Sequence, residues 1–321
     1  MKISSAIEGY ALHCRARGLK LKTVKGQVIK LKKLILYLGD IEIEDVTARD
    51  LHLFLGWLRT DYKPERIGSK YQTKGKLSKR GVYHHYQALR GFYRWARTKP
   101  EIVGYGLGID DQSRDLVKPK FQQIQIEPFT EKEIKELLKV IVPYKPKIRK
   151  KGKLYISQLG FQAAVLTMLD VGLRRGELLR LKIADWQAST GRLHIIQGKG
   201  DKDRFVFVGA KTQHAIWFYL EQRQPEKITE TLFATIQGGQ YNPDHFRQKI
   251  REYGLKAGIE DCHPHRFRHT CALLRIKNGE TAVSLQHLLG HTTPKMAMYY
   301  VKLAALDLED IQKNASPIDN L

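Results

Sequence analysis

Apolar residues in the first forty positions recur at intervals of three and four, the spacing that places them on one face of a helix. Residues 6–14 form one such run, and residues 24–38 form a second run that Gly39 ends. The pattern therefore predicts two consecutive amphipathic helices near the start of the chain.

Two further apolar runs are preceded by residues typical of helix N-caps. Thr47 is followed three positions later by Asp50, a variant capping box, and Ser78 precedes a run rich in aromatic residues. A polar, lysine-rich stretch over 63–77 separates these runs. The first hundred residues are thus expected to form four helices with a basic loop between the third and the fourth.

Glycine and aspartate break the helical pattern after residue 100, at Gly104, Gly106, Gly108 and Asp110. A chain of 321 residues exceeds one typical hydrophobic core, so two domains are expected. We interpret residues 101–127 as the linker between them, because the alternation near the end of this stretch is too loose to predict a strand.

A second domain is predicted to open at Thr130, which forms a capping box with Glu133. Its first helix is followed by a basic loop over 145–153. An apolar run over 161–169 then predicts another helix, which leads to Gly172.

Residues 194–197 and 205–208, which are rich in β-branched and aromatic residues, predict two short strands. The glycine-containing turn over 198–204 would join them as a hairpin. This places Lys199 at the tip of the hairpin.

Helices are predicted again after Pro264. The pair Asn278-Gly279 ends one helix, Thr281 caps the next, and Gly290 ends that one. Pro294 lies at the start of the last helix. The second domain is therefore expected to be mostly helical, with one small antiparallel sheet.

The composition shows a large excess of basic over acidic residues. The chain has 56 Lys and Arg against 33 Asp and Glu, a formal net charge of +23, whereas small domains usually carry a net charge of about 2 to 8. Residues 1–120 hold 25 basic and 12 acidic side chains and the remainder hold 31 and 21, so both domains share the excess. A basic balance of this size favours a nucleic acid as the partner.

A membrane is a less well supported partner. We find no run of about 18 apolar residues, no signal peptide and no lipidation motif, so a membrane-spanning or anchored protein is not expected. Cys14, Cys262 and Cys271 have neither the spacing of a disulfide framework nor a Cys-x-x-Cys pair. This usage fits a reducing compartment, and we expect a cytoplasmic, nucleoid-associated protein.

Short motifs in the last half of the chain carry the chemistry needed to attack a phosphodiester without a metal. A phenol can supply the attacking oxygen, and guanidinium, ammonium and imidazole groups can neutralise the phosphate. An unperturbed phenol has a pKa near 10 and needs such positive surroundings to act. The motifs are Gly-Leu-Arg-Arg-Gly-Glu, Gly-Lys-Gly, His-x-x-Arg, Leu-Leu-Gly-His and Tyr-Tyr, and they contain Arg174, Lys199, His265, Arg268, His291 and Tyr300.

These six residues, in this order, resemble the tyrosine recombinase (phage integrase) family. The resemblance implies that Tyr300 attacks a scissile phosphate and leaves a 3′-phosphotyrosyl bond and a free 5′ hydroxyl. It implies that Arg174, Arg268 and His291 hold the phosphate. A planar guanidinium suits this task because it can bind two phosphate oxygens at once.

The resemblance also implies which residues transfer the protons of the reaction. His265 would handle the proton of the tyrosine, and Lys199 would protonate the leaving oxygen. Glu177 would orient the arginine pair, because a carboxylate facing the phosphate would repel it. The reaction conserves the phosphodiester energy in the covalent bond, so neither ATP nor any other cofactor is implied.

Three neighbouring residues offer the same chemistry, namely Arg175, Lys202 and Tyr299. The family pattern favours Arg174 and Lys199, and the interval of nine residues after His291 favours Tyr300. Each residue alone has an ordinary explanation, since most surface arginines and lysines are solvated and a histidine after Gly290 can bind the last carbonyls of a helix.

A metal site is the rival interpretation of one cluster, which consists of Cys262, His263, His265, His269 and Cys271. Its spacing is not that of a zinc finger. If the segment is one helix, His265 and His269 provide two ligands at best, so no metal is expected.

Over nearly the whole chain, the resemblance implies a mainly α-helical protein. A four-helix, SAM-like core-binding domain over 1–100 would be joined by the linker to a catalytic domain over 128–303. The residues 304–321 would form a tail that docks on a neighbouring protomer or packs on its own domain. Because the helical pattern begins by residue 4, we expect the simple type without an arm-binding domain. Lys302 stands where many relatives have a histidine.

The implied partner is double-stranded DNA with short inverted core sites. The protein would form a homotetramer on paired sites and would be a monomer or weakly associated when free of DNA. Two alternatives remain open at this point: a type IB topoisomerase-like enzyme, which shares the chemistry, and a DNA-binding or architectural protein that has lost catalysis. The sequence specifies neither the target site nor the source element, and it does not distinguish integration, excision, resolution and inversion.

Overall fold

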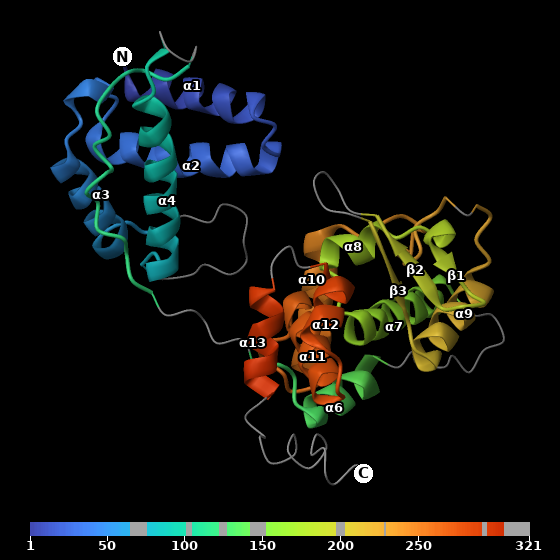
Figure 1. Cartoon of the computed structure of the whole chain (residues 1–321). Coiled ribbons are helices and arrows are strands. Elements are labelled where there is room, and N and C mark those ends of the chain that lie inside the picture. The colour runs from blue at the N-terminus through green and yellow to red at the C-terminus, as the bar shows by residue number, and fades with distance from the viewer. Residues whose placement is uncertain are drawn as a thin grey trace. The chain divides into compact units, whose positions relative to one another are not determined.

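The computed structural model describes residues 1–64, 76–100, 105–121, 127–141, 152–196, 203–227, 229–290 and 294–304. The contacts within the chain divide it into two units, Met1–Ile124 and Gln125–Leu321 (Figure 1). Each unit has a hydrophobic core of its own.

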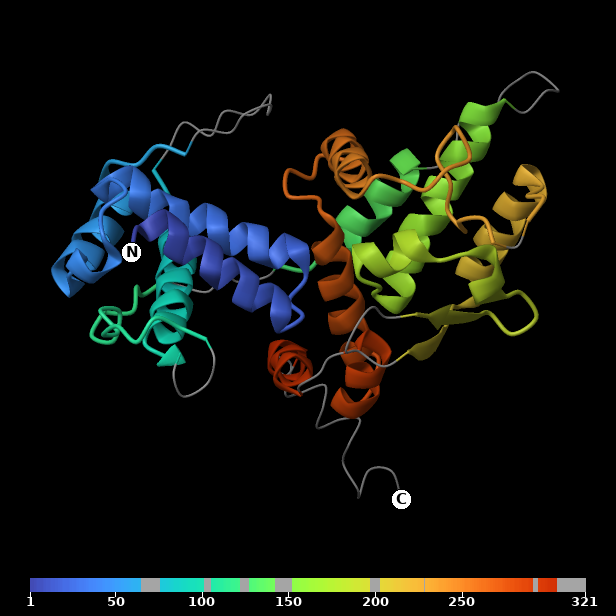
Figure 2. The ribbon, with the colours of Figure 1, turned by 90° about the horizontal axis from the view of Figure 1, so that it is seen from above.

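The first unit is helical, as predicted. Its elements are α1 (Ile3–Ala16), α2 (Leu21–Leu38), the 3-10 turn η1 (Ile43–Asp45), α3 (Ala48–Thr60) and α4 (Lys79–Ala96). α1 and α2 lie side by side, and α4 packs against the other three helices (Figures 1 and 2). The apolar faces that the sequence pattern identified meet in this core.

The predicted caps of the first unit are present. Thr47 Oγ1 accepts a hydrogen bond from the backbone N of Asp50 at 3.2 Å, and Asp50 Oδ2 accepts one from the backbone N of Thr47 at 2.9 Å. Ser78 Oγ accepts from the backbone N of Gly81 at 3.1 Å. These reciprocal bonds satisfy amide groups that have no partner within the first turn of a helix.

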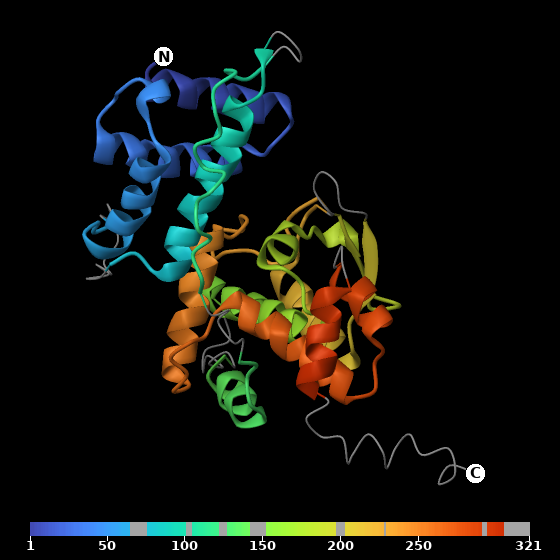
Figure 3. The same cartoon turned by 60° about the vertical axis from the view of Figure 1, so that its left-hand side comes forward.

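Residues 105–121 run back along α4 (Figures 1 and 3). Arg90 Nη1 donates to the carbonyl oxygen of Ser113 at 2.8 Å, and Leu116 is buried in the core of the first unit. Much of the stretch 101–127 that we interpreted as a linker therefore packs on the first unit. Its glycine and aspartate content indicates irregular backbone, but composition of this kind does not reveal packing.

The second unit is built around α7 (Lys153–Val171), with α9 (Ala210–Arg223) and α11 (Pro264–Lys277) packed against it (Figure 1). The other helices are α6 (Glu131–Ile141), α8 (Arg175–Arg180), α10 (Pro243–Lys256), α12 (Ala282–Leu289) and α13 (Lys295–Ala304), with a 3-10 turn η2 (Ile183–Asp185). Within the described ranges, α7 is the one helix that is long and apolar enough to cross a membrane by length and composition, and 56% of its apolar window is buried inside the fold. That burial is typical of a core helix.

The strands β1 (Trp186–Gln187), β2 (Arg192–Ile195) and β3 (Arg204–Phe207) form an antiparallel sheet in this order. Leu193 pairs with Val206, and both side chains are buried, whereas Phe205 and Phe207 are exposed. The small sheet is confirmed, but β2 begins two residues and β3 one residue earlier than predicted. The reason is that the buried face includes Leu193, which the predicted strand left out.

Five elements of the second unit were not predicted, namely α8, η2, β1, α9 and α10. The start of α10 did carry a signal, because Asn242 Oδ1 accepts from the backbone N of Asp244 at 2.8 Å and Pro243 occupies the first helical position. α9 carries a weaker one, since only Thr212, Ile216 and Tyr219 are buried along it.

The caps predicted in the second unit are also present. The backbone N of Thr130 donates to Glu133 Oε2 at 2.8 Å, and the backbone N of Glu133 donates to Thr130 Oγ1 at 3.2 Å. Thr281 Oγ1 caps α12 by accepting from the backbone N of Ser284 at 3.1 Å, and Gly290 ends this helix with φ 63°.

We expect Thr47→Ala to destabilise the first unit by about 1 kcal/mol, because it removes the two hydrogen bonds of Thr47 Oγ1, from the backbone N of Asp50 and to Asp50 Oδ2. The measurement is urea unfolding followed by tryptophan fluorescence. Thr60→Ala serves as a control, because Thr60 is an exposed residue at the other end of α3. Equal losses for the two variants would contradict the importance of the cap.

Candidate active site

The turn between α7 and α8 carries the first of the predicted phosphate-binding residues. α7 ends at Gly172, whose φ of 62° lies in the left-handed region, where other side chains are strained. A Cβ at this position would also meet Cδ2 of Leu289 at 2.7 Å. Glycine therefore allows the turn to approach the end of α12, and Arg174 follows as the N-cap residue of α8.

Two arginines of α11 point in different directions. Arg266 Nη2 donates to both carboxylate oxygens of Glu133 at 2.9 Å, which anchors α11 to the start of α6. Arg268 is buried, and it donates to the carbonyl oxygens of Gly172 at 2.8 Å and Leu289 at 2.7 Å. The structure thus brings Arg268, not Arg266, to the turn between α7 and α8.

The C-terminal end of α12 gathers three guanidinium groups from three other elements. Their hydrogen bonds run from Arg204 Nε to Leu288 O at 2.8 Å, from Arg268 Nη2 to Leu289 O at 2.7 Å and from Arg174 Nη2 to Gly290 O at 2.8 Å. Carbonyl groups at this end of a helix have no partner within the helix and lie at the negative end of its dipole. They are therefore suited to hold cations close together.

Glu177 provides the negative charge within this group. Its side chain is 4% exposed, and its carboxylate accepts from Arg174 Nη1 at 2.8 Å and from Arg204 Nη2 at 3.0 Å. The backbone N of Arg174 donates to it as well, at 2.9 Å. Burial acts to raise the pKa of Glu177, but the hydrogen bonds and charges of Arg204 and Arg174 outweigh it and hold the pKa below the ordinary value.

Arg268 is the most deeply buried of the three arginines. Burial, followed by the nearby charge of Arg174, lowers the pKa of Arg268 to about 10. The guanidinium is therefore still charged at neutral pH. A cation held in such surroundings interacts strongly with an anion, because little water is present to screen it.

Tyr300 lies on α13, which packs against α11 and α12 (Figure 1). Its side chain is 1% exposed and belongs to a small apolar cluster with Ala272, Leu285 and Leu289. Burial raises the pKa of the Tyr300 phenol to about 12, although the charge of Arg268 acts in the opposite direction. The free protein therefore keeps this phenol protonated at neutral pH.

His269 is a site residue to which the sequence analysis gave no part in the reaction. Its Nδ1 lies against the hydroxyl of Tyr300. His265 is one turn earlier on the same helix and is exposed. Loss of surrounding water, and then the charges of neighbours that include Arg268, lower the pKa of His265, which favours its neutral form. Helical spacing alone could have suggested His269 as well as His265, because residues four apart share a face.

The competing residues have other contacts where the structure describes them. Arg175 Nη1 donates to the carbonyl oxygen of Pro243 at 2.9 Å and pairs with the exposed Asp244 at 3.7 Å. Tyr299 is half-buried, and its ring meets that of Tyr300 edge-on, with centroids 5.6 Å apart. Lys199, Lys202 and His291 lie outside the described residues.

Among the described residues, no three His, Cys, Asp or Glu side chains come together as a metal site. The two cysteines of the proposed rival cluster are buried, and burial raises the pKa of both Cys262 and Cys271 to about 12. Cys271 Sγ donates to the carbonyl oxygen of Asp170 at 3.3 Å, and His269 faces Tyr300. The geometry therefore gives the zinc interpretation no support.

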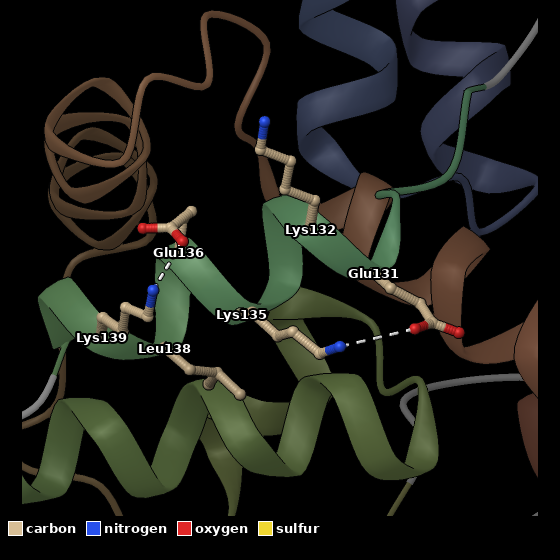
Figure 4. Close-up of a pocket in the computed structure, with 6 residues that line it drawn as sticks. All are labelled: Glu131, Lys132, Lys135, Glu136, Leu138 and Lys139. Atoms are coloured by element: carbon tan, nitrogen blue, oxygen red, sulfur yellow. Dashed lines mark hydrogen bonds and ion pairs between the residues drawn. The ribbon is translucent and has the colours of Figure 1, made fainter.

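A shallow hollow on α6 is separate from these residues (Figure 4). It is lined by Glu131, Lys132, Lys135, Glu136, Leu138 and Lys139. Lys139 pairs with Glu136 at 2.7 Å and Lys135 with Glu131 at 3.7 Å. These are exposed pairs on the surface of one helix, and none of the candidate site residues lines the hollow.

Comparison with known proteins gives a consistent result. Residues 127–306 match the sequence profile described as the phage integrase family. The chain is 27% identical to tyrosine recombinase XerA of Pyrococcus furiosus, over 99% of this chain and 96% of the relative. It is 26% identical to tyrosine recombinase XerD of Proteus mirabilis, over 94% and 89%.

A likeness in fold accompanies these matches. The crystal structure of a lambda integrase tetramer bound to a Holliday junction superposes with a TM-score of 0.68 and 17% sequence identity, covering 94% of this chain and 77% of that one. At this identity the likeness concerns the fold. It places the mostly helical architecture with its small antiparallel sheet among the tyrosine recombinases.

We expect Glu177→Gln to cost roughly 3 kcal/mol of unfolding free energy at neutral pH, because the buried Arg204 and the partly exposed Arg174 lose a charged partner. The pKa of Glu177 is lowered in the folded protein, so the ionised carboxylate stabilises the fold above its ordinary pKa, and this contribution disappears as the pH falls. The cost of the substitution should therefore be constant from neutral pH down to about pH 4.5, the ordinary pKa, and should shrink as the pH falls further.

Chemical unfolding at several pH values measures this difference. Glu136→Gln is the control, because Glu136 belongs to an exposed pair that should contribute little at any pH. A cost for Glu177→Gln that is independent of pH would show that the carboxylate is not ionised in the folded state.

Proposed function

The chain belongs to the phage integrase family and is a tyrosine-type site-specific DNA recombinase, and from this premise we propose that Tyr300 is its nucleophile. One observation carries the proposal: α13 holds this phenol against α11 and α12, next to the end of α12 that gathers Arg174 and Arg268. A phenol becomes a good nucleophile only where positive charge stabilises the phenolate and the pentavalent transition state.

In the proposed reaction, Tyr300 Oη attacks the scissile phosphorus and the bond from phosphorus to the 5′ oxygen breaks. The products are a 3′-phosphotyrosyl bond and a 5′ hydroxyl. Attack by a 5′ hydroxyl on the same phosphorus reverses the step and rejoins a strand. The covalent bond retains the energy of the phosphodiester, so no nucleotide cofactor enters the scheme.

The two arginines are proposed to bind non-bridging oxygens of the phosphate. Each guanidinium has five N–H groups. Contacts that position the side chain involve Nη1 and Nη2 in both cases: Arg174 donates to Glu177 and Gly290, and Arg268 to Gly172 and Leu289. A guanidinium oriented in this way can still present donors to an anion without rearranging. We propose His291, which follows Gly290 in sequence, as a third group on the phosphate.

Two histidines are candidates for the proton of the tyrosine. His265 remains our proposal, because its lowered pKa favours the neutral form that can accept a proton. His269 is the second candidate, because its Nδ1 already lies against the hydroxyl of Tyr300. Lys199, which lies between β2 and β3 in the sequence, is proposed to protonate the leaving 5′ oxygen.

The proposed partner is double-stranded DNA with short inverted core sites. The net charge of +23 supports a polyanionic partner. We propose that the first unit is the core-binding domain, the second the catalytic domain, and that a homotetramer forms on paired sites. The tail over 304–321 is proposed to dock on a neighbouring protomer, and we propose a cytoplasmic, nucleoid-associated location.

Tyr300→Phe should abolish covalent attachment to DNA and leave noncovalent binding nearly unchanged, because only the hydroxyl is lost. The substrate would be duplexes selected by binding from a random library, each carrying a nick near the centre to trap the adduct. The adduct is measured on denaturing gels in buffer that contains EDTA. Tyr299→Phe is the matched control. If the adduct persists in Tyr300→Phe and is lost in Tyr299→Phe, Tyr299 is the nucleophile and the proposal is wrong.

Lys199→Ala should slow cleavage about a hundredfold or more, because a positioned general acid contributes that much. A substrate with sulfur in place of the 5′ bridging oxygen should recover most of the rate, since its leaving group needs no proton. Lys202→Ala serves as the neighbouring control. A loss that the sulfur substrate does not recover would remove Lys199 from the role of general acid.

A further inference from the structure

Arg204 is a buried arginine of the site to which neither the sequence motifs nor the proposed reaction gives a role. It is the first residue of β3, and its side chain is 10% exposed. We propose that Arg204 is a positioning residue that offsets the charge of Glu177, so that Arg174 keeps its positive charge for the scissile phosphate. This inference rests on the proposed function and concerns the same site.

The contacts of Glu177 are the first argument. One carboxylate is shared between two guanidiniums, with Arg174 Nη1 on Oε1 at 2.8 Å and Arg204 Nη2 on Oε2 at 3.0 Å. The lowered pKa of Glu177 indicates that it is ionised at neutral pH. If Arg174 were its only partner, the carboxylate would cancel the charge that the phosphate needs.

The balance of charge is the second argument. Arg174, Arg204 and Arg268 supply three positive charges and Glu177 one negative charge, so this group carries a net charge of two positive units. Without Arg204, one unit would remain. The side chains also differ in access, because that of Arg174 is 37% exposed and that of Arg204 is 10% exposed. Arg174 is therefore accessible to a ligand, whereas Arg204 is nearly shielded from solvent.

The contact with α12 is the third argument. Arg204 Nε donates to Leu288 O, and the next two carbonyls, of Leu289 and Gly290, accept from Arg268 and Arg174. The guanidinium of Arg204 therefore joins β3, α8 and α12.

The test separates the effect of charge from that of packing. Arg204→Gln should slow single-turnover cleavage of the nicked substrate by roughly tenfold to a hundredfold, less than the loss of a donor that contacts the reacting group directly. Glu177→Gln combined with Arg204→Gln restores the net charge to two positive units. The double variant should therefore cleave faster than Arg204→Gln alone. Arg204→Lys, which keeps the charge, should retain more activity than Arg204→Gln.

A buried arginine outside the site provides the control for folding. Arg223 has a side chain that is 9% exposed and pairs with Glu230. Arg223→Gln should lower the thermal midpoint as Arg204→Gln does, but it should leave the cleavage rate unchanged. DNA affinity, measured with an uncleavable duplex, should be unchanged in both variants, because neither side chain is accessible enough to dominate binding.

Two results would overturn the inference: cleavage by Arg204→Gln at the parental rate, or a double variant no faster than Arg204→Gln. The second result would mean that Arg204 acts only as a brace between β3 and α12. Failure of the proposed function gives a different result, because the parental chain would then form no adduct that depends on Tyr300. The inference is thus tested only after that adduct has been established, and it can fail while the function stands.

Discussion

The end of α12 is the feature on which the site depends. Three consecutive carbonyl groups there accept hydrogen bonds from Arg204, Arg268 and Arg174, which arrive from β3, α11 and the turn before α8. Cations crowded in this way repel one another, and burial disfavours them further. Carbonyl dipoles stabilise these cations without adding full negative charges, which would weaken the positive field at the proposed phosphate site. Glu177 is the one carboxylate among these contacts. A strong positive field is thus compatible with a folded protein.

The same arrangement is compatible with burial of Tyr300, the proposed nucleophile. A phenol with a pKa of about 12 is a poor nucleophile in the free protein. Its apolar neighbours on α11 and α12 hold the ring, and Leu289 belongs both to this cluster and to the row of carbonyls. Packing of α13 and placement of the arginines are therefore coupled through one end of one helix. In the proposed reaction, the phosphate enters between them.

Sequence reasoning was most effective where the cause is local. Caps such as Thr47 with Asp50, and the four helices of the first unit, follow from side chains a few positions apart. The motif residues Arg174 and Arg268 were found through family resemblance, and the structure brings them together. Arg204 and His269 were missed because their partners are 27 and 31 residues away in sequence. The contacts of Arg204 depend on how β3 packs, which no local pattern encodes. His269 shares a helical face with His265, but its contact with Tyr300 depends on how α13 packs.

Two glycines show why scattered motifs become one site. Gly172 ends α7 and Gly290 ends α12, both with left-handed backbone, at φ 62° and 63°. At Gly172 a side chain would collide with Leu289, so only glycine allows the two helix ends to meet. Each glycine is followed within two residues by a motif position, Arg174 in one case and His291 in the other. The close approach of two chain reversals therefore brings together the turn that carries Arg174 and the end of α12, although Arg174 and Gly290 are 116 positions apart in the sequence. Any substitution that separates these ends should displace Arg174 and Arg268 together, because both donate hydrogen bonds to the end of α12.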